Sequence, residues 1–178
     1  IRINARGQAI AAHGVLPPGA VGFDPSLSGP LAEYDPARAK ALLDTYGYVD
    51  RDGDGWREQP DGRPLQLVMA SPSSQLARNA DELWKKSMNA VGIRIDFRKG
   101  KFQELIRDSR AGRLMMFGSG WSGPMPDGEY FMGILYGPNA GQSNQSRFDH
   151  PEFNRLFAQA ARIADGPERE RLYREMKR

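Results

Sequence analysis

Residues 118–123 combine glycines with an aromatic side chain directly after an apolar run. The stretch Gly118-Ser119-Gly120-Trp121-Ser122-Gly123 matches the G-x-G-x-x-G pattern of dinucleotide-binding loops. That pattern must open a helix, and Pro124 and Pro126 prevent a continuous helix at this point. We therefore interpret the stretch as a ligand-facing loop in which Trp121 offers a ring face for stacking. The alternative, that Trp121 only fills the edge of the core, stays equally open.

Residues 50–61 carry acidic side chains at the spacing of a calcium-binding loop. Asp50, Asp52 and Asp54 occupy loop positions 1, 3 and 5, and a glycine follows at position 6. Position 12 is Asp61, where the pattern asks for a bidentate Glu. Acidic, glycine-rich turns also form without metal, because Asp and Gly accept left-handed backbone angles and bond their own amides. A structural calcium ion held by Asp50, Asp52 and Asp54 is therefore the alternative hypothesis for this chain.

Residue sets that support catalysis are missing from the sequence. The chain has no cysteine, which removes disulfides, zinc knuckles, iron–sulfur clusters and thiol nucleophiles. His13 and His150 are far apart, and neither has a second metal ligand at helical spacing. Asp127 and Glu129 are close enough for an acid/base pair, but no activating partner lies near them in the sequence. These residues therefore give no positive support for catalysis.

Residues 137–147 form a polar loop of Asn, Gln and Ser between glycines. Amide and hydroxyl groups of this kind can hydrogen-bond a polar guest without charge matching. The same composition is typical of a solvated loop, so both interpretations stay open. Binding is favoured slightly, because this loop and Trp121 can reach the same edge of a sheet.

The elements that position these loops follow a β-α-β-α-β order after an initial helix. Asp35 and Gly47 mark the ends of that helix, with Pro36 at its first position. Strands are predicted at 65–69, 93–97 and 114–117, and the last has no polar face, as expected of a strand covered on both sides. The helix between the first two strands begins at Ser73 or Ser74 and has an apolar face that includes Leu76 and Trp84. The next helix begins near residue 102 and ends before Gly112. This order favours a parallel or mixed sheet, whose ligands bind beyond the carboxyl ends of the strands.

The two ends of the chain differ in character. The first 34 residues are rich in proline and glycine and predict an irregular lead-in. After a short apolar helix near 130–136, two helices close the chain, and Asp165 and Glu168 have the spacing of a capping box before the last one.

Composition is that of an ordinary globular chain. The 178 residues are 39% hydrophobic and 26% charged, with a formal net charge of +3. No apolar stretch approaches the roughly 20 residues of a membrane-spanning helix. Basic residues near the C-terminus alternate with acids, as on a solvated helix face, so we expect no nucleic-acid partner.

A series of short motifs runs through the chain. One group comprises Tyr34-Asp35-Pro36-Ala37-Arg38-Ala39-Lys40-Ala41-Leu42-Leu43, Tyr46-Gly47-Tyr48, Asp52-Gly53-Asp54-Gly55 and Gly62-Arg63-Pro64-Leu65. Another comprises Gly14-Val15-Leu16-Pro17-Pro18-Gly19, Val91-Gly92-Ile93, Gly120-Trp121 and Asp165…Glu168-Arg169…Leu172-Tyr173. Their ordered series over some 160 residues resembles the C-terminal lobe of dipeptide/oligopeptide-type (family 5) extracellular solute-binding proteins of ABC importers.

This resemblance implies one lobe of a two-lobed periplasmic binding protein, with an α/β fold whose mixed sheet is flanked by helices. Residues 1–34 are then an irregular, hinge-proximal segment, and 35–178 an incomplete C-terminal lobe. We expect the N-terminal lobe and the final return segment to lie outside these residues, with the lead-in resting on that absent structure. The signal peptide is likewise expected outside them, and the location periplasmic or extracytoplasmic.

The resemblance also implies a non-enzymatic receptor without a cofactor, together with its partners and its binding site. The partners are a small polar solute, such as a peptide, and the ABC transporter permease that receives it. In peptide-binding members an Asp shortly after the Gly-Trp pair receives the ligand's amino terminus, but here that place falls at or beside Pro124. Asp127 is the nearest acid and takes over that role, or the guest lacks an ammonium group. The candidate ligand-binding residues are Trp121, Ser122, Asp127, Asn139 and Asn144.

Overall fold

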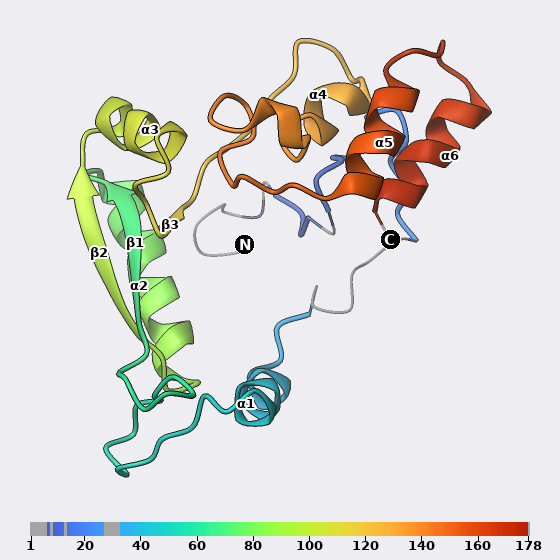
Figure 1. Cartoon of the computed structure of the whole chain (residues 1–178). Helices are drawn as coiled ribbons and strands as arrows, with labels where there is room; N and C mark the ends of the chain where they lie inside the picture. Colours follow the sequence, from blue (N-terminus) through green and yellow to red (C-terminus); the bar gives the residue numbers. More distant parts are fainter. Residues whose placement is uncertain (1–6, 8, 13, 27–32, 178) are drawn as a thin grey trace. The chain divides into compact units, whose positions relative to one another are not determined.

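The structure, a computed structural model, describes residues 7, 9–12, 14–26 and 33–177. Within them the chain divides into two units, each described by itself below (Figure 1). The first unit holds residues 33–108 and 113–118. The second holds residues 9–26, 109–112 and 119–177. Part of the expected lead-in thus groups with the chain that follows residue 118.

A parallel sheet of three strands forms the centre of the first unit. Strands β1 (Gln66–Pro72), β2 (Arg94–Gly100) and β3 (Met116–Phe117) lie in the order β2-β1-β3. In the register, Leu67 is opposite Ile95, and Met69 is opposite Met116. The predicted β-α-β-α-β order is confirmed, and the sheet is parallel between all its described strands.

Local capping signals explain where the helices of this unit begin. Helix α1 (Pro36–Thr45) starts after Asp35, whose carboxylate accepts the Arg38 N–H at 2.9 Å. Helix α2 (Gln75–Asn89) starts after Ser74, whose hydroxyl accepts the Ala77 N–H. Helix α3 (Phe102–Arg110) ends before Gly112, as predicted. These caps satisfy amide groups that the first turn of a helix leaves without partners.

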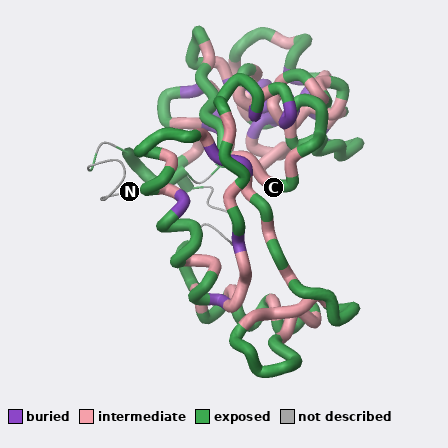
Figure 2. The backbone as a smooth tube through the Cα atoms, turned by 90° about the vertical axis from the view of Figure 1, so that its left-hand side faces the viewer, coloured by how far each residue is buried: buried purple, intermediate pink, exposed green. Residues whose placement is uncertain are grey.

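Helix α2 contacts the sheet through a polar group as well as through apolar side chains. Asp81 is its one buried residue among those described, and its carboxylate accepts from the Ser71 hydroxyl at 2.8 Å and pairs with Lys99. The predicted apolar face is largely open, with Leu76 67% and Trp84 40% exposed. Figure 2 shows how short the buried stretches are along the backbone.

Strand β3 is shorter and less covered than the sequence predicts. The apolar run at 114–117 indicated a strand buried on both faces, but only Met116 and Phe117 pair with β1, and both are half-buried. Met115 is 65% exposed, and its Sδ accepts the Val68 N–H at 3.3 Å. Apolar composition alone therefore overestimated how deeply this strand is buried.

Helices dominate the second unit. They are α4 (Gly128–Met132), a 3-10 turn η1 (Gly137–Asn139), α5 (Pro151–Ala160) and α6 (Pro167–Met176). Helices α5 and α6 lie side by side with α4 next to them (Figure 1). Their apolar faces meet in one core, made of Leu16, Met132, Phe153, Leu156, Phe157, Ala160, Leu172 and Tyr173.

Part of the proline-rich lead-in belongs to this core, which corrects the expectation that it rests on absent structure. Leu16 is only 4% exposed, and the Val21 N–H donates to the Pro126 carbonyl at 2.8 Å. Gly22 has φ +82°, and a Cβ there would lie 2.7 Å from the Tyr173 ring. A glycine is needed at this point because any side chain would collide with the core.

The start of α6 also differs from its prediction. The residue that caps the helix is Gly166, with no side-chain cap, and Asp165 pairs instead with Arg169. The capping-box spacing therefore marks the right place, although the Asp165 carboxylate has another partner. In the described residues no helix has the length and apolar character needed to cross a membrane.

Candidate functional site

Residues 121–143 of the second unit, with one side chain from α5, enclose a pocket of about 590 Å³. Aromatic rings make much of its wall: Tyr136 stacks on Phe157 with ring centres 4.5 Å apart. The remaining wall carries carboxylates, an amide and a hydroxyl. We call this the aromatic pocket; its lining residues are Trp121, Met125, Asp127, Glu129, Tyr130, Gly133, Tyr136, Asn139, Ser143 and Phe157.

Trp121 lines the pocket, and its indole N–H already has a hydrogen-bond acceptor within the protein. The indole Nε1–H donates to the Tyr130 carbonyl at 2.8 Å, which ties the glycine-rich loop to α4. The residue is still 46% exposed, so its ring is accessible to a guest. An indole with a satisfied donor offers a stacking face rather than a hydrogen bond.

Asp127 is the N-cap of α4, and its carboxylate is bound within the fold. One oxygen accepts the Glu129 N–H at 2.9 Å, and the other pairs with Arg169 at 3.0 Å. Burial works to raise the pKa of Asp127, but the Glu129 amide and the Arg169 guanidinium outweigh it and hold this pKa below its usual value. Asp127 is therefore ionised at neutral pH and neutralised by an internal partner.

The polar loop at 137–147 is shaped by its own amides. Asn139 Nδ2 and the Ser143 hydroxyl both donate to the Gly133 carbonyl, at 3.0 and 3.3 Å, which places these two side chains in the pocket wall. Asn144 is fully buried and donates from Nδ2 to the Tyr136 and Phe148 carbonyls. It closes the loop from inside, since a buried amide must find partners in the protein.

Arg147 anchors the end of this loop on the last turn of α3. Its guanidinium donates to the Arg110 carbonyl at 2.7 Å and, more weakly, to the Ser109 carbonyl. The backbone of Arg147 has φ +56°, which an L-residue rarely adopts. Its charge lies at the negative end of the helix dipole, where cations are stabilising.

The structure brings together three of the five predicted ligand-binding residues. Trp121, Asp127 and Asn139 line the aromatic pocket. Ser122 is exposed outside its lining, and Asn144 lies beneath the loop. Prediction from the sequence missed the part played by Glu129, Tyr130, Tyr136, Ser143 and Phe157, all of which line the pocket. The available signal was the pair of tyrosines in the short apolar segment at 130–136.

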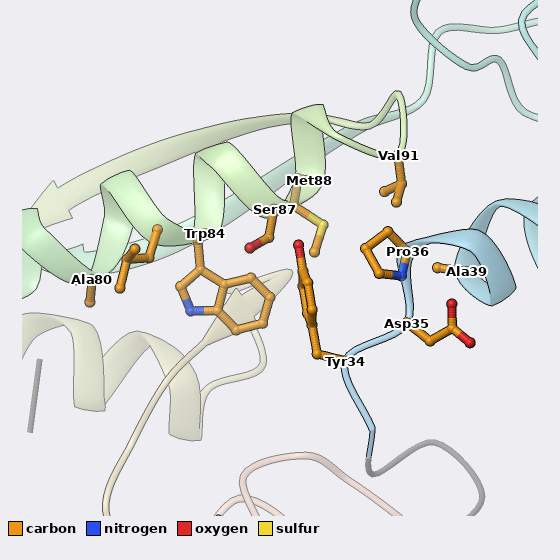
Figure 3. Close-up of a pocket in the computed structure, with 10 residues that line it drawn as sticks. Tyr34, Asp35, Pro36, Ala39, Ala80, Trp84, Ser87, Met88 and Val91 are labelled. Carbon is orange, nitrogen blue, oxygen red and sulfur yellow. The ribbon is translucent and has the colours of Figure 1, made fainter. Parts of the chain in front are cut away.

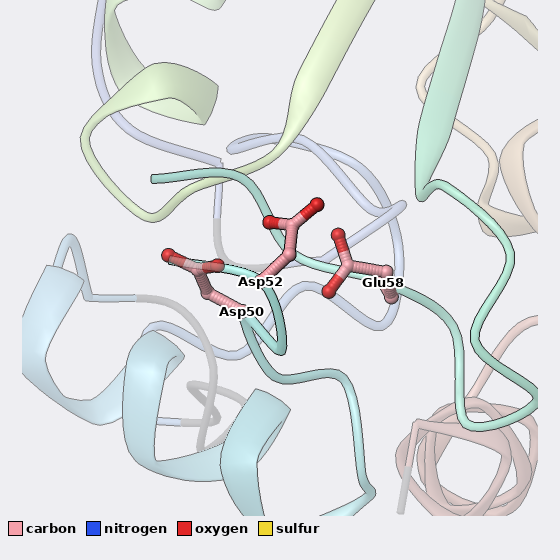
Figure 4. A group of neighbouring side chains, drawn as sticks. All are labelled: Asp50, Asp52 and Glu58. Carbon is pink, nitrogen blue, oxygen red and sulfur yellow. The ribbon is translucent and has the colours of Figure 1, made fainter. Parts of the chain in front are cut away.

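The acidic loop gathers a different set of carboxylates from the predicted one. Asp50, Asp52 and Glu58 have oxygens within 4.8 Å of one another (Figure 4), whereas Asp54 pairs with Arg94 at 2.7 Å. Both Asp50 oxygens accept loop amides, from Gly53 and Gly55. Asp61, at the twelfth position, pairs with Arg63 instead of turning to the loop. Two of the three predicted donors, Asp50 and Asp52, thus lie together with Glu58, whereas the third, Asp54, has an arginine partner. A calcium ion in this loop stays a prediction.

A second pocket, of about 430 Å³, lies in the first unit between the start of α1 and the open face of α2. Tyr34, Pro36, Trp84, Met88 and Val91 converge on it (Figure 3). Its wall is almost wholly apolar, and the Asp35 carboxylate at its rim is bound to the Arg38 N–H. Few polar groups are left to orient a polar guest, so the aromatic pocket is the better candidate site.

Comparison with known proteins identifies the family of this chain. The family described as "Bacterial extracellular solute-binding proteins, family 5 Middle" matches residues 2–143. Di/tripeptide-binding protein 2 of Pseudomonas aeruginosa is 30% identical over 176 residues, covering 96% of this chain and 30% of the relative. Heme-binding protein A of Haemophilus influenzae is 27% identical, covering 96% and 29%. The chain thus spans about 30% of the length of these relatives.

A solved structure supports the same fold. The mannohexaose-bound periplasmic oligopeptide-binding protein of an oligopeptide ABC transporter from Thermotoga maritima aligns with a TM-score of 0.83. It is 19% identical, and the alignment covers 99% of this chain and 35% of that one. The predicted fold class is confirmed, and so is the predicted family. The chain belongs to the family 5 bacterial extracellular solute-binding proteins.

Proposed function

We propose that this chain forms a ligand-binding lobe of an extracytoplasmic receptor that delivers a small peptide or a similar polar solute to an ABC permease. The observation that carries the proposal is the aromatic pocket, where ring faces and hydrogen-bonding groups converge in about 590 Å³. Relatives named for di/tripeptides and for heme, and a neighbour holding mannohexaose, support a receptor whose guest varies between members.

Within the pocket we assign different tasks to the predicted residues. Trp121 stacks on the guest, and Asn139 bonds it through the amide oxygen that the loop leaves unused. Ser122 contacts it from the exposed loop beside Trp121. Asn144 acts indirectly, by keeping the loop closed beneath Asn139. Asp127 positions α4 rather than receiving a charged group.

A second lobe completes the receptor in this proposal. The relatives are about three times longer than the chain, which leaves room for an N-terminal lobe and a return segment. Residues 35–178 then form part of the C-terminal lobe, and 1–34 lead into it from the hinge side. A ligand that contacts both lobes stabilises the closed state through its higher affinity for that state, and the permease binds the closed form.

Native mass spectrometry of the intact protein, purified without denaturation, tests the receptor function. We expect a discrete added mass, in the range of a small peptide or another polar solute, that is lost on denaturation. Calorimetric titration then compares the intact protein with this chain alone, which we expect to bind at least about a hundredfold more weakly because half the contacts are gone. Equal affinities would contradict the two-lobed mechanism.

A further inference from the structure

Arg169 connects α6 to the wall of the aromatic pocket. Its side chain is only 6% exposed, yet the guanidinium pairs with Asp127 at 3.0 Å and with Glu129 at 2.8 Å. It also pairs with Asp165 and donates to the Ala160 carbonyl at 3.1 Å. The planar guanidinium can serve several acceptors in one geometry, so Arg169 sets where the two pocket carboxylates lie.

The two carboxylates differ in what they can still accept. Asp127 is 23% exposed, and its oxygens take the Glu129 N–H, the Arg169 guanidinium and, at 3.4 Å, the Tyr173 hydroxyl. The Glu129 side chain is 44% exposed, and Arg169 contacts its Oε2. A carboxylate has about four acceptor positions, so Glu129 keeps acceptor capacity beyond the Oε2 contact with Arg169.

The surroundings of Glu129 suit a ligand that carries a hydrogen-bond donor next to a flat or apolar group. Trp121 and Tyr130 flank the same pocket with ring faces, and the Trp121 N–H is occupied by the Tyr130 carbonyl. One guanidinium against the two pocket carboxylates leaves one formal negative charge on this wall. A charged acceptor beside aromatic faces favours a guest that brings an N–H or O–H donor.

We propose that Glu129 is a specificity-determining residue of the aromatic pocket and that Arg169 is the residue that positions it. Glu129 receives a donor group of the ligand, either an ammonium or a hydroxyl, in the place that sequence reasoning gave to Asp127. This inference rests on the proposed receptor function and narrows the ligand class to solutes that present such a donor next to an apolar or aromatic surface.

Calorimetric titration of the intact protein with three probes tests this assignment: trialanine, N-acetyl-trialanine and mannohexaose. Glu129→Gln keeps the shape of the side chain but removes its charge. For a probe that the wild type binds, we expect the affinity of this variant to be about tenfold lower. Glu152→Gln is the matched control, because Glu152 also pairs with a single arginine, Arg155, but lies on α5 outside the pocket lining. Thermal melts establish that both variants are folded.

The outcomes distinguish an error in the assignment of Glu129 from an error in the proposed receptor function. If trialanine binds and its N-acetyl form loses the Glu129 dependence, the donor is an ammonium; a dependence with mannohexaose identifies a hydroxyl. Arg169→Lys, with its melting temperature measured first, should reduce affinity for the same probe and leave a ligand without the donor unaffected. Binding that Glu129→Gln changes by less than twofold overturns the assignment and leaves the receptor standing. Binding of none of the probes to the wild type counts against both.

Discussion

Replacing Arg169 by methionine should destabilise the second unit far more than any other single loss of a charged group on its helices. Methionine keeps much of the apolar stem and removes the guanidinium, which is 6% exposed and has three carboxylate partners. Breaking a buried ion pair from one side typically costs 3–5 kcal/mol, because the partner stays behind without compensation. The partners here are 23%, 44% and 67% exposed, so only Asp127 is largely shielded from water.

We therefore reduce the expected loss to about 2–3 kcal/mol. The guanidinium also lies 5.3 Å from the centre of the Tyr173 ring, a contact worth about 0.5–1 kcal/mol that falls within this range. For a chain of this size, each kcal/mol shifts the melting temperature by about 2–4 °C, which gives about 4–12 °C.

Urea unfolding followed by circular dichroism measures the loss directly. Arg155→Met is the matched control, because Arg155 and Glu152 are 59% and 58% exposed and ion pairs on the surface add little to stability. Equal unfolding midpoints for the two variants would refute the view that Arg169 organises this unit. A larger loss for Arg169→Met with an unchanged m-value would support it, since the exposed surface on unfolding is then the same.

Three further outcomes follow from the geometry. Asp127 has a lowered pKa in the folded state, so its stabilising contribution is complete above its ordinary value of 3.8 and is lost as the pH falls through the lowered one. The difference in unfolding midpoint between wild type and Asp127→Asn should therefore be largest near pH 7 and narrow below about pH 4. Gly128→Ala should cost about 2 kcal/mol or more in the same urea assay, because its Cβ would lie 2.5 Å from the Val21 carbonyl; a loss under 0.5 kcal/mol would show that the lead-in does not press on α4. Calcium at about 5 mM should leave the melting temperature within about 1 °C of its value with chelator, and a clear rise would show that the loop at 50–61 binds the ion despite the arginine partners of Asp54 and Asp61.

Local signals in the sequence were sufficient for most helix and strand boundaries. Asp35 caps α1 as predicted, Ser74 is the one of two candidate serines that caps α2, and Gly47 follows α1 with φ +80°. These features depend on neighbours within a few residues, so the chain around them contains the needed information. The family could also be identified, because an ordered series of short motifs resembles it, and the family model matches residues 2–143.

The pocket could not be predicted to the same depth, because its wall depends on contacts distant in sequence. The sequence showed no partner near Glu129, and the residue that pairs with it, Arg169, lies 40 residues later. The Asp165 spacing predicted a helix cap, yet the carboxylate pairs with Arg169 instead. Likewise, the apolar residues of α2 indicated a buried face, while the buried position on that helix is Asp81. In each of these cases, the environment of the side chain depends on which of its possible partners it contacts in the folded chain.

The distance in sequence between Arg169 and its partners sets the order in which the pocket is completed. Glu129 and Asp127 precede Arg169 by 40 and 42 residues, so both acids are synthesised before the guanidinium that pairs with them. At about 5–20 residues per second, this interval lasts roughly 2–8 seconds. A chain that ends within this interval has the two acids of the pocket wall and lacks their shared cation. The wall of the aromatic pocket is therefore complete only in a chain that includes α6.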